Sequence, residues 1–227
     1  MDQRFPDEFV TWNHKTPIGV KVDEVFGMDN KKGQTWISLA KQIFSEQGDT
    51  DYRIIEHFES GAPFMEGYSG RISLTHTKNL LAVAFLPKTP EVSLEVFNPR
   101  TALGIDAEPL DRTQVIKVRD KFLYEKEKSL VPEEDIIANI LAWTSKEALY
   151  KAALTAGLDF KNDIELLSLS ALHKDPLNKT DLRLGEAKIH FPANSGIPVQ
   201  EMKLYSYESY GCCISIAYSP KCAKFGK

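Results

Sequence analysis

Apolar residues recur at helical spacing in two stretches of the chain. The first stripe predicts a helix that ends near Gly48, and its apolar residues are Trp36, Leu39, Ala40, Ile43 and Phe44. A longer helix is predicted from about Pro132 to Ala156. Proline suits a first helical turn, the acidic residues 133–135 match the positive end of the helix dipole, and Gly157 stands just beyond as a stop signal.

Shorter segments combine strand-forming residues with turn residues on either side. Residues 71–76 and 80–85 predict one β-hairpin, and residues 201–207 and 212–218 predict another around Gly211. Both hairpins end in the same way, with an alanine followed shortly afterwards by proline and lysine.

This echo between the two hairpins indicates an internal repeat. We therefore expect an α+β protein of two similar halves, each an antiparallel sheet packed with a long helix. The halves are joined near residues 99–104, and the predicted division is into residues 1–102 and 103–227.

Another strand is predicted over residues 101–108, ending at a break that Pro109 imposes. Alternate residues of a strand share a face, so Asp106 and Glu108 lie on the same side while Ala107 points the other way. Two carboxylates ~4 Å apart repel by roughly 4 kcal/mol at an effective dielectric constant near 20. The pair therefore indicates a hard-cation site, although two solvated acids at a strand end are an alternative.

Polar residues also share one stripe of the long predicted helix. Trp143, Glu147 and Lys151 are four positions apart, and Lys146 stands beside them. Without other information, Glu147 and Lys151 could equally form a surface ion pair worth ~0.3 to 0.5 kcal/mol, with Trp143 as a core aromatic residue.

Hydroxyl and imidazole groups gather at the end of the strand over residues 71–76. Thr75 and His76 are donors suited to an anionic ligand, and the alternative is a histidine that is incidental to a turn.

Composition narrows the class of protein. The net charge is -4, from 28 basic and 32 acidic side chains, which argues against a nucleic-acid-binding protein.

Three cysteines without Cys-x-x-Cys spacing suggest neither a disulfide framework nor a zinc site, and the adjacent Cys212 and Cys213 are expected to fill the core. The first residues form no apolar signal core, and no apolar run approaches the ~18 residues of a membrane span. We expect a soluble, cytoplasmic protein.

Two motifs follow one another in an order that is typical of one protein family. Gly104-Ile105-Asp106-Ala107-Glu108 is followed by Trp143-Thr144-Ser145-Lys146-Glu147-Ala148-Leu149-Tyr150-Lys151. This pattern resembles the 4′-phosphopantetheinyl transferase superfamily, in which Gly-x-Asp-x-Glu precedes an aromatic residue, Lys-Glu and a further lysine. A third family block resembles residues 73–77, and residues 61–63 resemble the Gly-Lys-Pro that precedes it.

The resemblance implies the larger, monomeric class of this family, a pseudo-dimer of two α+β halves with coenzyme A bound between them. It implies transfer of 4′-phosphopantetheine from coenzyme A to a serine of an apo acyl or peptidyl carrier protein. Mg²⁺ would be held by Asp106, Glu108 and Glu147. Glu147 would act as the base, and Lys151 and Lys146 would stabilise the transition state. The coenzyme A phosphates would bind Lys151 together with Thr75 and His76.

Two other readings remain open from the sequence. Ala62 stands where family members often carry a lysine that contacts coenzyme A, so the chain could be a divergent, non-catalytic protein that binds coenzyme A or a carrier domain. An unrelated Mg²⁺-dependent phosphohydrolase would instead release phosphate without modifying a carrier.

Overall fold

The chain forms two compact units, residues 1–97 and residues 98–227. The structure is a computed structural model, and it describes residues 9–12, 16–24, 55–57, 62–65, 71–78, 80–85, 102–170, 173–174, 181–192 and 199–219. The helix predicted to end near Gly48 lies outside the described residues. Ala102, which the sequence division assigned to the first half, begins the first described strand of the second unit.

Antiparallel strands form the sheet of the first unit, in the order β1-β2-β6-β5. These strands are β1 (Phe9–Trp12), β2 (Thr16–Glu24), β5 (Ile72–His76) and β6 (Leu80–Phe85). A separate pair consists of β3 (Ile55–His57) and β4 (Pro63–Met65). The Thr77 N–H donates to the Leu80 carbonyl at 2.8 Å and closes the turn between β5 and β6, which confirms the first predicted hairpin.

The second unit is built on a larger antiparallel sheet in the order β7-β12-β11-β10-β8, with β9 (His173–Lys174) paired to β10. Its main strands are β7 (Ala102–Pro109), β8 (Ile164–Leu169), β10 (Asp181–Ile189), β11 (Gln200–Ser209) and β12 (Cys212–Ser219). Tyr210 and Gly211 both have positive φ angles, 48° and 68°, as in the two-residue turns that suit the twist of a hairpin. The predicted hairpin around Gly211 is confirmed.

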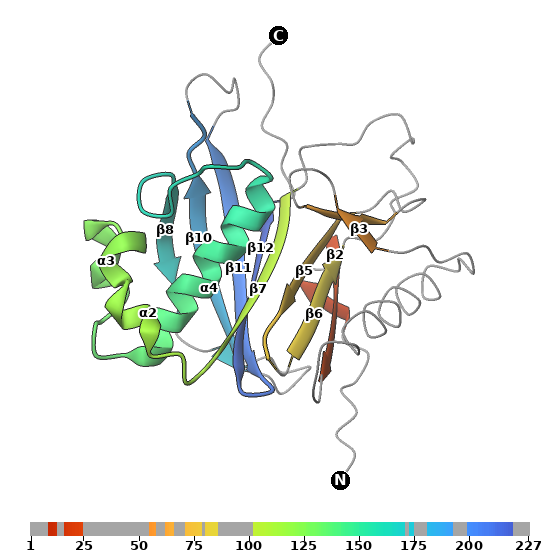
Figure 1. Cartoon of the computed structure of the whole chain (residues 1–227), viewed down its shortest axis with the longest axis horizontal. Coiled ribbons are helices and arrows are strands. Elements are labelled where there is room, and N and C mark those ends of the chain that lie inside the picture. Colours follow the sequence, from red (N-terminus) through yellow and green to blue (C-terminus); the bar gives the residue numbers. More distant parts are fainter. Residues whose placement is uncertain are drawn as a thin grey trace. The chain divides into compact units, whose positions relative to one another are not determined.

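Helix α4 (Ile136–Ala153) crosses one face of this sheet (Figure 1). Shorter helical segments connect β7 to α4, namely α2 (Gln114–Lys117), α3 (Arg119–Phe122) and the 3₁₀ helix η1 (Glu125–Ser129). The helix and the sheet enclose a core of small and aliphatic residues, which includes Ala148, Leu149, Ala152, Leu166, Ala187, Leu204 and Ala217.

The predicted ends of the long helix were wrong. Helix α4 begins at Ile136 because Asp135 is its N-cap, and the Asp135 carboxylate accepts a hydrogen bond of 2.9 Å from the Ala138 N–H. The acidic residues 133–135 therefore precede the first turn. At the other end Leu154 already adopts a left-handed conformation, with φ at 50°, so the helix stops before Gly157.

Both adjacent cysteines lie in the interior, as expected of core residues. Cys212 and Cys213 are each 3% exposed. Burial raises the pKa of the Cys213 thiol to about 11, which keeps the group protonated and unreactive at neutral pH.

Helices and antiparallel sheets occur together, as predicted, whereas the pseudo-dimer arrangement stays a prediction. In the described part of the chain, no helix has the length and apolarity needed to span a membrane.

Candidate active site

A glycine brings helix α4 against strand β7. A Cβ atom at Gly104 would lie 1.9 Å from the Ala148 carbonyl oxygen and 2.7 Å from the Ala152 nitrogen, distances that no side chain can occupy. The glycine therefore lets the helix backbone rest directly on the strand. Asp106 and Glu108 follow at alternate positions, so their side chains project from the same face towards α4.

Asp106 forms an ion pair with Lys151, the last residue of the helical stripe. Asp106 is 6% exposed, and its Oδ1 atom accepts a hydrogen bond of 2.7 Å from the Lys151 Nζ atom. The same ammonium group donates to the Ile105 carbonyl at 3.1 Å. Lys151 keeps 31% of its side chain exposed, so a ligand can approach the charge from solvent.

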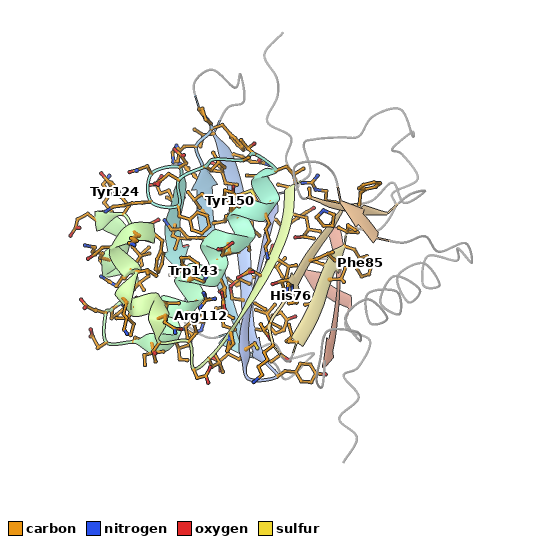
Figure 2. All side chains as sticks on the ribbon, in the orientation of Figure 1. His76, Phe85, Arg112, Tyr124, Trp143 and Tyr150 are labelled. Carbon is orange, nitrogen blue, oxygen red and sulfur yellow. The ribbon has the colours of Figure 1, made fainter. Side chains whose placement is uncertain are left out.

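Glu108 is held by two donors. The Trp143 indole N–H donates to the Glu108 Oε1 atom at 3.1 Å, and the Arg112 guanidinium forms an ion pair with that same oxygen. The Arg112 guanidinium also lies 5.7 Å from the centre of the Trp143 ring, within cation–π distance (Figure 2).

Glu147 lies between Trp143 and Lys151 on the same stripe of helix α4. Burial raises the pKa of its half-buried carboxyl, and repulsion from Asp106 raises it further, while Lys151 and Arg112 act in the opposite direction. The repulsion means that the carboxylates of Glu147 and Asp106 are close enough to interact. The predicted stripe therefore faces the predicted carboxylate pair.

The donor set suits a hard cation. Magnesium prefers carboxylate oxygens, and two mutually repelling carboxylates gain stability from a shared positive charge. Within the described residues, however, no three Asp, Glu, His or Cys side chains converge as a formed metal site. Magnesium ligation by Asp106, Glu108 and Glu147 therefore stays a prediction.

Comparison with known proteins identifies this part of the chain. The model of the 4′-phosphopantetheinyl transferase superfamily matches residues 102–199. This segment is therefore similar to that superfamily. The matched residues contain β7 and α4, and hence both motifs that suggested the resemblance. No curated protein matches the chain.

Lys146 has a different environment from the one predicted. Its side chain is completely buried, and the Nζ atom donates to the Glu127 carboxylate at 2.7 Å and to the carbonyls of Phe160 and Ile164 at 2.7 and 2.6 Å. All three ammonium protons are thus used inside the core. These contacts favour a structural role for Lys146, because the charge cannot reach a phosphate without leaving these partners. The catalytic role of Lys146 stays a prediction.

Glu127 completes this buried network and was missed in the sequence. Its side chain is 1% exposed, and it also accepts hydrogen bonds from the backbone N–H groups of Tyr124, at 2.7 Å, and Leu166, at 2.6 Å. The network joins the segment before α4 to strand β8. Glu127 lies far from Lys146 in the sequence, so no periodicity signals the pair.

Trp143 combines the two roles that the sequence left as alternatives. Its ring packs edge-on against Phe122, with centroids 5.1 Å apart, and also contacts Phe160. At the same time its N–H is directed to Glu108. Arg112 was missed, because a spacing of four residues indicates an ion pair on a helix and Glu108 lies on a strand that ends at Pro109.

Two of the three predicted coenzyme A donors, Thr75 and His76, lie in the first unit, outside the matched segment. Thr75 and His76 are neighbours on β5, where Thr75 is buried and His76 is exposed. Adjacent strand residues project to opposite faces, so the two side chains do not share one surface of the sheet. Their role in binding coenzyme A stays a prediction.

Proposed function

We propose that this protein transfers 4′-phosphopantetheine from coenzyme A to a serine hydroxyl of an apo acyl or peptidyl carrier protein, with Mg²⁺, and releases adenosine 3′,5′-bisphosphate. The superfamily match supports phosphopantetheinyl transfer in general. The observation that carries the specific proposal is that helix α4 places Lys151 on Asp106 and Trp143 on Glu108, with Glu147 close enough to Asp106 for the two carboxylates to repel.

The three carboxylates are the residues that would hold magnesium. When bound, the ion would neutralise negative charge on the pyrophosphate oxygens of coenzyme A. Asp106 is suited to such a role because its side chain is largely buried and fixed by Lys151. Glu108 is fixed by Trp143 in a similar way.

Glu147 is the residue best suited to accept the proton of the attacking serine. A new bond forms between the serine oxygen and phosphorus, the bond from phosphorus to the adenosine bisphosphate oxygen breaks, and the serine proton passes to the Glu147 carboxylate. A general base works best when its pKa lies near the working pH, and burial shifts the Glu147 pKa upward in that direction.

Lys151 would offset charge that develops on the phosphates during transfer. Its ammonium group is positioned by Asp106 and the Ile105 carbonyl, so little reorganisation is needed when an anionic substrate arrives. A lysine reaches phosphate as a single compact charge on a flexible stem, which suits a ligand that enters and leaves.

The test uses the full chain with coenzyme A, Mg²⁺ and a panel of apo carrier proteins, followed by mass spectrometry for the addition of one phosphopantetheine group. We expect addition to at least one carrier. We expect Glu147→Gln to retain coenzyme A binding and lose transfer, while the matched change at an exposed residue before α4, Glu134→Gln, keeps full activity.

Two outcomes would contradict parts of this proposal. Coenzyme A binding without transfer to any carrier would favour the non-catalytic binding protein, which Ala62 in place of the family lysine also suggests. Full transfer activity in Glu147→Gln would remove that residue from both the base and the metal-ligand assignments.

A further inference from the structure

One oxygen of Glu108 is already fully occupied. The Oε1 atom accepts the Trp143 N–H and is also paired with the Arg112 guanidinium. A carboxylate oxygen has two lone pairs, so these two donors use both. A metal ion that binds this oxygen must therefore replace one of them.

Arg112 is held beside Glu108 by the turn that follows β7. The Arg112 N–H donates to the Pro109 carbonyl at 3.1 Å, and the Leu110 N–H donates to the Gly211 carbonyl at 2.9 Å. These bonds shape the turn between Glu108 and Arg112, the two residues that form the ion pair. The turn therefore keeps the Arg112 side chain within reach of Glu108.

The charge of the same guanidinium acts on a second carboxylate. Besides its ion pair with Glu108, Arg112 favours the ionised form of Glu147 and so opposes the rise in the pKa of that carboxyl. Arg112 therefore stabilises the negative charge of two predicted metal ligands, as a divalent ion bound there would.

We propose that Arg112 is an internal cation that competes with magnesium for Glu108, so that metal binding moves the guanidinium off the carboxylate. The inference rests on the metal-dependent function proposed above. Arg112 has 38% of its side chain exposed and Glu108 has 13%, so the guanidinium has solvent to move into, while the carboxylate does not. The indole of Trp143, which touches both groups, is a reporter of the exchange.

The first measurement is the metal affinity of the full chain. Mn²⁺ binding is followed by electron paramagnetic resonance and Mg²⁺ binding by calorimetry, both without substrate. Arg112→Gln and Arg112→Met remove the charge, and we expect each to bind the metals roughly five- to tenfold more tightly than the wild type. The methionine variant keeps an apolar stem over Trp143, so a loss of packing affects the two variants differently.

Matched controls separate competition from general electrostatics. Lys117→Gln removes one positive charge from an exposed residue of nearby α2, and we expect its metal affinity to stay within about twofold of the wild type. Glu108→Gln should weaken metal binding whether or not Arg112 is present. Thermal unfolding of each variant establishes that it is folded.

The second measurement is fluorescence in a background with Trp12→Phe and Trp36→Phe, in which only Trp143 emits. Added Mg²⁺ should change the emission in the Arg112 form, because the guanidinium leaves Glu108 and shifts over the ring. The change should be much smaller in Arg112→Gln.

The outcomes distinguish this inference from the proposed function. Unchanged or weaker metal affinity in both charge-removing variants overturns the competition, even if carrier modification proceeds with Mg²⁺. Absence of metal binding in the wild type and in both variants also overturns it. Absence of carrier modification, by contrast, contradicts the proposed function and leaves the measured competition between Arg112 and metal intact.

Discussion

Replacing Gly104 with alanine tests whether close contact between α4 and β7 forms the site. The added Cβ would meet two backbone atoms, the Ala148 oxygen at 1.9 Å and the Ala152 nitrogen at 2.7 Å. Neither atom belongs to a flexible side chain, so the helix or the strand must move. Relief of the closer contact to an ordinary distance requires a displacement of about 1.5 Å.

This displacement should cost activity more than stability. Overpacking of a core typically costs ~1 to 3 kcal/mol, whereas a 1 Å misplacement of catalytic groups can cost roughly 100-fold in rate. We expect Gly104→Ala to remain folded, with urea denaturation giving a loss in that range. Phosphopantetheine transfer, measured by mass spectrometry, should fall at least roughly 100-fold because Lys151 and Glu147 move away from Asp106.

Gly157→Asn is the matched control. Gly157 has a φ of 82° and open space where a Cβ would lie, and asparagine tolerates this conformation better than most residues. We expect this variant to keep its transfer rate. Transfer by Gly104→Ala within about twofold of the wild type would refute the reasoning, since the contact would then not position the catalytic groups.

Three further predictions follow from the cited contacts. Lys146→Met should lower the free energy of unfolding by roughly 3 to 5 kcal/mol in urea denaturation, because it leaves the buried Glu127 carboxylate uncompensated, and the double change with Glu127→Leu should recover part of the loss. The pKa of the Glu147 carboxyl is raised in the folded state, so this group contributes stability below its unfolded pKa, and the contribution is lost as pH rises through the folded pKa. Relative to Glu147→Gln, the wild type should therefore lose stability across that pH window. Its transfer rate should rise across the same window. A wild-type advantage that grows with pH would contradict this sign. Asp135→Ala should cost about 1 kcal/mol through loss of the N-cap bond to Ala138, without a change in transfer rate, and a stability unchanged in thermal denaturation would show that the cap contributes nothing.

Features set by local sequence were predictable. Strand alternation placed Asp106 and Glu108 on one face, and helical spacing placed Trp143, Glu147 and Lys151 on one stripe. The two hairpins were also predictable, because turn residues separate their strands. The helix start was not, since acidic residues near an N-terminus suit both a first turn and the cap that precedes it.

Features set by distant contacts were not predictable from periodicity. Lys146 precedes Glu147 by one position, which rotates it about 100° around the helix and away from the stripe of Trp143, Glu147 and Lys151. That rotation alone leaves open whether a lysine is exposed or buried. Burial becomes tolerable only because Glu127 and two carbonyls satisfy its charge, and these partners come from separate segments.

The spacing of the two motifs has a common geometric cause. Alternate strand residues are about 6.6 Å apart, and helix residues four positions apart are about 6 Å apart. A helix that runs antiparallel to a strand can therefore keep one stripe over the other. Trp143 contacts Glu108, Lys151 contacts Asp106, and the helix backbone at Ala148 and Ala152 lies against Gly104. Trp143 and Lys151 are two helical steps apart, about 12 Å, while Glu108 and Asp106 are one strand step apart, so the two long side chains converge on the carboxylate pair. A slip of one residue in the strand would turn both carboxylates to the opposite face of the sheet, so the signature records a register and not only a set of reactive groups.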